Sequence, residues 1–583
     1  MSSTLVKQPQ EQVKTPCLFW GILDLKYDTS EPILERVKVL ETGDGRTSKF
    51  SGDGAEILRQ QRERYRVEAA ASLQRFSFVS TDKKLTHDLM DSAGYKHIVP
   101  GQVCFPRKYL PDLAERIVAS LNLKRSDYIV LKLCNRSRAA GVMAVQAGEL
   151  DAMLKDLLLP PEDLEAWFEE RLAAIAEGSA ADLGLQDSAA EEQRRHWWSN
   201  EHPSFVAERC CTSMPTMREG KAYDGTMRVG FALRRKNGKG NNTTSLSADD
   251  LEVDWLGGYW KLPKRDMGDE DVRGRLISAA RTFGTAPVEP VHLHEVYAAL
   301  GNSVEHLFSG PEPSPDLFEE QYGNEEHAEL ACYFIAKCGA GSIREVERAH
   351  NVLDRAQKMA EKVSDEQVQR CLQSFIHRCR GVCVARSTGD WKAAKLFLNF
   401  SVESNPYNAN ALYLLGMASL DLGEPDAALG LLNKSVLLDP DFKAPYVALG
   451  IAYLRTHDFQ RAIEISEAGL ARHPESPQCH YHIFHAHCQQ ILMVADEDTK
   501  EFGDLVDRAA VALHAARSSD DGQKRRPESF SQMVVLEPPW LAADDQLAQM
   551  LQYCKERSSM WDALKKRGKM TGMLKVVGWR YIG

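Results

Sequence analysis

The sequence predicts an α+β region over residues 16–265, followed by an all-α helical solenoid over residues 375–490. Two observations lead to this prediction. In the first part, short strand-like apolar runs alternate with amphipathic helical segments and glycine-rich turns. In the second part, small residues and prolines recur every 34 residues, a period typical of stacked helical hairpins.

Length and charge set limits on the class of protein. A chain of 583 residues with 43% hydrophobic content is too long for one core, so we expect several domains. The net charge of -11 argues against a nucleic-acid partner, because such partners select for a basic face. No stretch reaches the ~20 apolar residues of a membrane span. We therefore expect a cytoplasmic protein that binds neither membrane nor nucleic acid.

Five apolar runs predict the strands of the α+β region. Residues 150–200 read as helix throughout. The rest of the chain divides into a disordered N-terminus at 1–15, a helical and loop connector at 266–374, and C-terminal helices at 491–583 with a disordered loop near 517–528. The predicted strands are Leu18–Tyr27, Val37–Glu41, Tyr128–Leu133, Ser204–Cys210 and Thr226–Leu233.

The repeat has a packing explanation. Small residues fit where the two helices of a hairpin cross closely, and a proline ends the second helix before the next unit. The residues at this spacing are Ala394, Ala428 and Ala462, Gly416 and Gly450, and Pro406, Pro440 and Pro474. The pattern resembles the tetratricopeptide (TPR) family, with units starting near residues 375, 409 and 443. A degenerate fourth unit starts at 477, where Phe484 replaces the glycine.

The resemblance implies that the first helix of each unit lines a concave groove. That groove is predicted to be apolar, and it lacks the Lys and Asn array of chaperone-binding members of the family. We expect an amphipathic helix to fill it, either from a protein partner or from the chain's own C-terminal helix near residues 541–561. The predicted groove positions are Tyr413, Met417 and Leu420 in one unit and Val447, Ile451 and Leu454 in the next.

The order of charged and glycine residues from Asp82 to Arg228 resembles that of the ATP-grasp ligases, which implies a triphosphate site in the α+β region. A triphosphate needs two or more cations held by rigid elements, and Lys83, Lys132 and Arg228 are candidates. A loop containing Gly141 would bring backbone N–H groups close to phosphate oxygens. A carboxylate such as Glu208 can accept the ribose hydroxyls.

The order of these features resembles the ATP-grasp ligases. The segment from Asp82 to Pro100 is similar to the lysine, helix, Ala-Gly and proline opening of that family, and Lys132 and Gly141 match its strand lysine and phosphate-covering loop. Glu208 lies on the matching hinge strand. Asp224 and Arg228 match the strand that faces the triphosphate, where Arg228 would be catalytic. The resemblance implies ATP and Mg²⁺ as cofactors.

The expected magnesium segment departs from the family. Where ATP-grasp ligases have Glu-x-Asn-Pro, this chain has Trp260-Lys261-Leu262-Pro263, and neither Trp nor Leu supplies the oxygen ligands that Mg²⁺ takes. Residues 21–52 instead resemble the family's metal hairpin, displaced to the start of the chain. The hypothesis is a permuted site in which Asp24, Glu41 and Asp44 bind Mg²⁺; the alternative is a hairpin whose carboxylates face water.

Two functions therefore remain open from the sequence. The first is an ATP-dependent ligase that activates a carboxylate as an acyl-phosphate and uses the repeats to recruit a protein. The second is a non-catalytic TPR scaffold carrying a degenerate nucleotide-binding domain. The sequence does not name an acceptor, because the loops that shape such pockets follow no general code.

Overall fold

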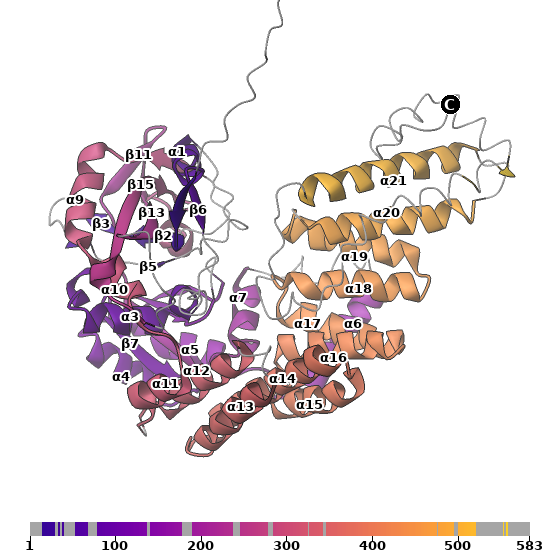
Figure 1. Cartoon of the computed structure of the whole chain (residues 1–583), viewed down its shortest axis with the longest axis horizontal. Coiled ribbons are helices and arrows are strands. Elements are labelled where there is room, and N and C mark those ends of the chain that lie inside the picture. Colours follow the sequence, from indigo (N-terminus) through magenta and orange to yellow (C-terminus); the bar gives the residue numbers. More distant parts are fainter. Residues whose placement is uncertain are drawn as a thin grey trace, which may run out of the picture. The chain divides into compact units, whose positions relative to one another are not determined.

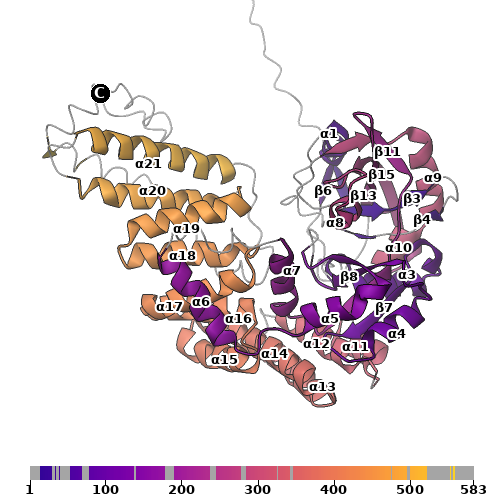
Figure 2. The same ribbon diagram turned by 180° about the vertical axis from the view of Figure 1, so that it is seen from behind.

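The structure is a computed structural model. It describes residues 14–28, 53–67 and 78–520, apart from gaps at 137–139, 178–188, 237–244, 278–283, 325, 342–345, 475 and 495–498. It also describes the backbone of 33–34 and 38–39, and residues 552, 556 and 557. Figures 1 and 2 show the chain from two sides.

The chain forms two compact units whose boundaries differ from those predicted. Residues up to 158 together with 204–318 form an α/β unit, and residues 159–203 together with the chain from 319 form a helical unit. The predicted connector at 266–374 is divided between them. Its first part belongs to the α/β unit because β16 (Thr285–Pro287) pairs with β15 (Leu251–Lys261) of the sheet.

Two antiparallel sheets organise the α/β unit. The four-stranded sheet has the order β7-β10-β8-β9, and the five-stranded sheet has the order β16-β15-β13-β2-β5. The bounds are β2 (Phe19–Leu25), β5 (Lys38–Val39), β7 (Gln102–Pro106), β8 (Tyr128–Leu133), β9 (Met143–Gln146), β10 (Ser204–Arg209) and β13 (Thr226–Arg235). Four of the five predicted runs thus form strands, the described residues 38–39 of the fifth are also a strand, and the mixed fold is confirmed.

The core of the α/β unit explains why these runs become strands. Leu23, Val229 and Phe231 on neighbouring strands are fully buried, and Phe308 of α10 (Ser303–Phe308) packs on Phe231 with ring centroids 6.1 Å apart. Alternating apolar side chains need a second layer to cover them. Helices α9 (Pro290–Leu300) and α10 supply part of it.

The helical unit is a succession of antiparallel hairpins (Figure 1). Four of them follow the predicted repeat, and a further hairpin, α12/α13, precedes it. The bounds are α12 (Ala328–Gly341), α13 (Val346–Ala360), α14 (Glu366–Thr388), α15 (Trp391–Ser404), α16 (Ala409–Asp421), α17 (Pro425–Leu438), α18 (Lys443–Arg455), α19 (Phe459–Arg472), α20 (Pro477–Ile491) and α21 (Thr499–Asp520). Helix α21 extends into the loop predicted as disordered, through residue 520.

Close helix crossings account for the small residues of the repeat. Ala394, Ala428 and Ala462 are completely buried. A Cβ atom added to Gly416 would lie 2.8 Å from the side chain of Leu432 on the facing helix. Because atoms cannot approach so closely without a shift, glycine at this position lets α16 and α17 pack together.

The inserted segment at residues 159–203 packs on the second helix of a hairpin. Its helices are α6 (Leu164–Glu177) and α7 (Ala189–Trp198), and both lie against α17 (Figure 2). Phe168 is buried in the same core cluster as Leu432 and Val436, and Lys434 lies over its ring. The predicted continuous helix is interrupted at residues 159–163, and α6 and α7 pack on the repeats rather than on the α/β unit.

None of the described helices is both long enough and apolar enough to cross a bilayer.

The close crossing at Gly416 is testable against a matched glycine. In both Gly416→Ala and Gly430→Ala, the higher helix propensity of alanine stabilises the helix by ~1 kcal/mol relative to glycine. A Cβ on Gly430 meets nothing within 4 Å, whereas one on Gly416 meets Leu432. We expect Gly430→Ala to raise the free energy of unfolding and Gly416→Ala to lower it by ~1–3 kcal/mol, as overpacking does. Equal effects in chemical denaturation would contradict the packing described.

Candidate functional site

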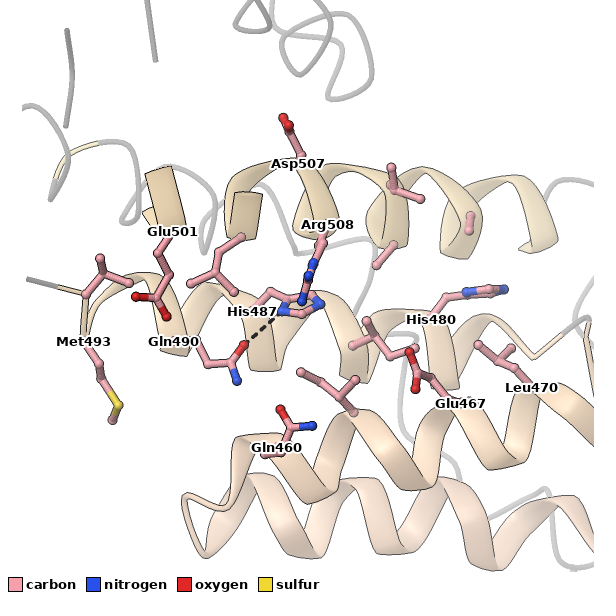
Figure 3. Close-up of a pocket in the computed structure, with 17 residues that line it drawn as sticks. Gln460, Glu467, Leu470, His480, His487, Gln490, Met493, Glu501, Asp507 and Arg508 are labelled. Atoms are coloured by element: carbon pink, nitrogen blue, oxygen red, sulfur yellow. Dashed lines mark hydrogen bonds between the residues drawn. The ribbon is translucent and has the colours of Figure 1, made fainter. Parts of the chain in front are cut away.

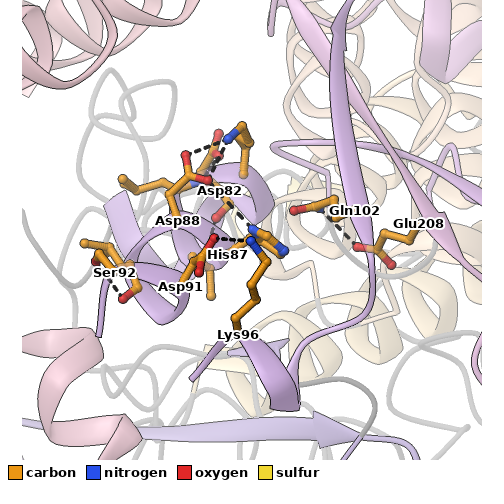
Figure 4. Close-up of polar contacts among 12 residues, drawn as sticks. Asp82, His87, Asp88, Asp91, Ser92, Lys96, Gln102 and Glu208 are labelled. Atoms are coloured by element: carbon orange, nitrogen blue, oxygen red, sulfur yellow. Dashed lines mark hydrogen bonds and ion pairs between the residues drawn. The ribbon is translucent and has the colours of Figure 1, made fainter. Parts of the chain in front are cut away.

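A buried ion pair lies on the four-stranded sheet. Lys132 of β8 donates a hydrogen bond to Glu208 of β10, and the lysine side chain is 1% exposed. The two residues share a face because Lys132 is opposite Val206 and Glu208 is opposite Val130 in the antiparallel register. Gln102 of β7 donates to the other Glu208 oxygen at 3.3 Å (Figure 4). The structure therefore joins two of the predicted nucleotide-binding residues to each other.

Lys83 lies at the start of α3 (Lys83–Ser92), beyond the end of β8. Its ammonium group donates to the carbonyl oxygens of Leu133 at 2.6 Å, Cys134 at 3.3 Å and Arg136 at 2.5 Å. Asp82 caps the helix by accepting from the Leu85 N–H at 3.0 Å. In this structure Lys83 thus anchors the chain that follows β8, which leads toward Gly141.

Asp24 and Arg228 lie opposite each other on adjacent strands of the five-stranded sheet. The Arg228 Nε donates to an Asp24 oxygen at 3.1 Å, and its Nη1 donates to the Tyr259 hydroxyl at 3.3 Å. Asp24 also faces the backbone of Lys38 on β5, so the predicted hairpin strand pairs as expected. The side chains of Glu41 and Asp44 lie outside the described residues, and the metal hypothesis stays a prediction.

Asp224 has a different partner from Arg228. It accepts from the Lys26 ammonium at 2.9 Å and from the Ser213 N–H at 2.7 Å, and both charged side chains are 3% exposed. Gly141 has a φ of 69°, in the left-handed region that favours glycine, directly before β9. The printed contacts thus join four of the predicted residues in two pairs, Lys132 with Glu208 on the four-stranded sheet and Asp24 with Arg228 on the five-stranded sheet.

The sequence Trp260-Lys261-Leu262 is part of the interior. Trp260 and Leu262 are both 3% exposed and belong to the hydrophobic core of the α/β unit. Both side chains therefore fill the core, and neither supplies an oxygen ligand for Mg²⁺.

The helical unit holds a second group of buried charges that sequence analysis missed. Glu201, in the inserted segment, accepts from Arg378 of α14, from Asn408 at 3.0 Å and from Asn410 at 3.2 Å. Arg378 and Glu201 side chains are 10% and 9% exposed. The signal was present in the residue types, but nothing in the sequence relates residue 201 to residue 378.

A potential metal cluster lies where α7 meets the repeats. Glu192, His196 and Asp441 bring one ligand atom each within 4.8 Å of the others. The guanidinium of Arg472 already binds both carboxylates, at 3.1 Å to each. Burial raises the pKa of Asp441, but the hydrogen bond and charge of His196 and the charge of Arg472 outweigh it and bring that pKa to about 2. The cluster therefore serves as an ion-paired joint between α7 and the repeats.

The predicted concave positions are only partly accessible. Tyr413 and Leu420 are buried, and Tyr413 packs on Phe442 with ring centroids 5.2 Å apart. Half-buried apolar side chains remain on α16 and α18, namely Met417, Val447, Ile451 and Leu454. A cavity of about 1080 Å³ lies elsewhere, against α19, α20 and α21, and none of the six predicted positions lines it (Figure 3).

No known protein-family model matches the chain, and no curated protein matches its sequence. Several solved structures resemble part of it. MamA from Desulfovibrio magneticus RS-1 is 18% identical with a TM-score of 0.24, over 32% of this chain and 97% of that one. YrrB, described as a TPR protein with an unusual peptide-binding site, is 16% identical with a TM-score of 0.26, over 35% and 96%. The assignment of helical hairpins rests on the chain's own geometry.

The Lys132–Glu208 pair yields a prediction on stability. Lys132→Met leaves a buried carboxylate without its cation, so we expect a loss of ~3–5 kcal/mol in the free energy of unfolding. The double variant Lys132→Met/Glu208→Leu should recover most of that loss. As a control, Lys155→Met breaks the exposed ion pair with Asp151 and should cost less than ~1 kcal/mol. A double variant that is no more stable than Lys132→Met in denaturant unfolding would contradict the pairing.

A buried histidine predicts how stability varies with pH. Burial, aided by the charge of His485, lowers the pKa of His482 to about 3. Between that value and the ~6.5 of an unfolded histidine, the unfolded chain binds more protons, so stability falls as the pH falls. We expect His482→Gln to flatten this dependence by up to ~1.4 kcal/mol per pH unit, whereas the exposed His514→Gln leaves it unchanged. Identical pH profiles for both variants in thermal unfolding would exclude His482 as the source.

Proposed function

We propose that this chain is a non-catalytic scaffold that holds a protein partner on its helical hairpins, with an α/β unit that is a degenerate nucleotide-binding domain. The observation that carries the proposal is the internal pairing of the predicted phosphate-binding cations. Lys132 binds Glu208, Arg228 binds Asp24, and Lys83 binds three backbone carbonyls. Cations paired in this way stabilise the fold, and they would have to leave their partners in order to bind a triphosphate.

The pairs are also costly to open. A buried ion pair separated by a ligand leaves both groups to be solvated or paired again, and breaking one costs several kcal/mol. A nucleotide would have to replace the Glu208 carboxylate with a phosphate while that carboxylate stays buried. The same charges in a working ligase need to face the substrate, because catalysis depends on interactions made with the transition state.

The helical unit supplies the interaction surface. An apolar row of half-buried side chains runs along the first helices α16 and α18. It consists of Met417, Val447, Ile451 and Leu454, and Met417 and Ile451 occupy the same position in successive repeats, 34 residues apart. Rows of this kind bind an amphipathic helix or an extended peptide by burying its apolar side chains. Each large apolar side chain of a partner buried there would contribute ~1.5–3 kcal/mol.

One observation favours a second candidate, the Mg²⁺- and ATP-dependent ligase. Asp24, from the start of the chain, lies beside Arg228 on the neighbouring strand, and this is where a displaced metal hairpin would have to be. In that case the Asp24 carboxylate would leave its arginine and help to hold a magnesium ion, which would neutralise charge on the phosphates. This candidate requires divalent-dependent nucleotide binding that Asp24→Ala removes.

Site-specific cross-linking tests the scaffold. A photo-reactive benzoyl-phenylalanine at Val447 of the full chain should give a discrete protein adduct in cell extract, and Ile451→Glu, one turn away, should abolish it. The same group at Val291, an exposed apolar residue of α9, is the control and should give no such adduct. Adducts that do not depend on residue 451, or none at all, would exclude this face as the partner site.

A further inference from the structure

The cavity in the helical unit is a groove with an apolar floor. It is bounded by the second helices α19 and α21, and α20 lies between them (Figure 3). Apolar side chains from all three helices line it, including Ile463, Ile483, Leu505 and Val511. Val511 is 70% exposed and Met493, at the end of α20, is 69% exposed. Exposed apolar side chains at one groove usually mark a binding surface.

The degenerate fourth repeat explains why the groove is there. His480 and His487 stand 34 residues after Tyr446 and Tyr453, which are both buried against the neighbouring second helices. Imidazoles are smaller and more polar than phenol rings, and burial lowers the pKa of both histidines. At the two positions where the preceding unit has buried tyrosines, α20 thus has smaller and more polar side chains, and both line the groove.

The rim of the groove is acidic. Glu467 and Glu501 face the groove, Asp507 lies on α21 with its carboxylate pointing away from α20, and Arg508 is the arginine among the described lining residues (Figure 3). An occupant that fits this surface has an apolar stripe for the floor and basic residues for the rim.

The chain's own C-terminal segment has this chemistry. Within it, Gln552 and Glu556 are helical and exposed, and their side chains hydrogen-bond at 3.1 Å. At 100° per residue, the sequence places Leu547, Met550, Cys554 and Trp561 on the side of such a helix opposite Gln552. Residues 555–569 contain six Lys and Arg (555, 557, 565, 566, 567 and 569) and two acidic residues (556 and 562).

We propose that residues 547–569 form an amphipathic helix that occupies the groove between α19 and α21 of the same chain. The segment follows α21, one wall of the groove, after 26 linking residues (546 minus 520), which span up to ~85 Å when extended. Such a tether gives an effective concentration in the millimolar range. A second helix of the repeats already accepts helices from this chain, because α6 and α7 pack on α17. The proposal concerns a different face from the partner row on α16 and α18, so either can fail alone.

Hydrogen–deuterium exchange on the full chain tests the proposal. In the wild type, the amides of residues 547–561 should exchange at least tenfold more slowly than an unstructured peptide. Val511→Glu and Met493→Glu each place a carboxylate in the groove, and both should accelerate that exchange at least tenfold. Leu396→Glu, an equally exposed apolar site on α15 (62% exposed), is the matched control and should have no effect.

Hydrogen exchange of the α21 amides shows whether a variant has unfolded this side of the groove. Met493→Glu serves as the second variant because residue 493 lies outside α21. Fast exchange of residues 547–561 in the wild type would overturn the proposal. Slow exchange that neither groove variant alters would also overturn it, as would protection that appears only at high protein concentration, because that result would place a second copy in the groove.

Discussion

The helical unit depends on the ion pair and hydrogen bonds that the buried carboxylate of Glu201 makes. It binds Arg378, Asn408 and Asn410, so it connects the inserted segment to two successive hairpins. The chain leaves the α/β unit after residue 158 and returns to it at residue 204, three residues beyond this carboxylate. The repeats and the α/β unit are therefore interleaved along the sequence, and the inserted helices are an integral part of the repeat stack. The surfaces left for a partner are those that this segment does not cover.

The sequence predicted what depends on local pattern. The 34-residue period identified the hairpins because a small residue is needed wherever two helices cross closely. Gly416, which faces Leu432, is an example. The pattern missed β15, because a β-bulge at Gly257 shifts the alternation of buried and exposed side chains along this strand. As a result, Val253 and Trp255 before the bulge face the same core as Trp260 and Leu262 after it. It also placed residues 159–200 with the α/β unit, whereas they belong to the helical unit. An amphipathic pattern shows that a helix buries one face, but it does not show against what, and α6 buries its face on α17.

The candidate site was predictable in its residue types but not in its pairings. The order of residues in the sequence identified four charged side chains as candidates for nucleotide or metal binding, and all four are largely buried. They are Lys132, Glu208, Asp24 and Arg228. Their pairing with one another follows from strand register, which joins residues 76 and 204 positions apart. A lysine on a strand looks the same in sequence whether its partner is a phosphate or a carboxylate. Glu41 and Asp44 remain predictions, since they lie outside the described residues.

The scaffold account depends on these cations being satisfied within the fold. The most direct test is thermal unfolding of the full chain with and without saturating Mg²⁺ and ATP. The account predicts an unchanged melting temperature, because Lys83, Lys132 and Arg228 are each engaged by groups of the fold. A nucleotide bound at 100 times its dissociation constant would add ~2.7 kcal/mol and raise the melting temperature by several degrees. A magnesium-dependent rise that Asp24→Ala abolishes would contradict the account and establish the α/β unit as a working nucleotide site.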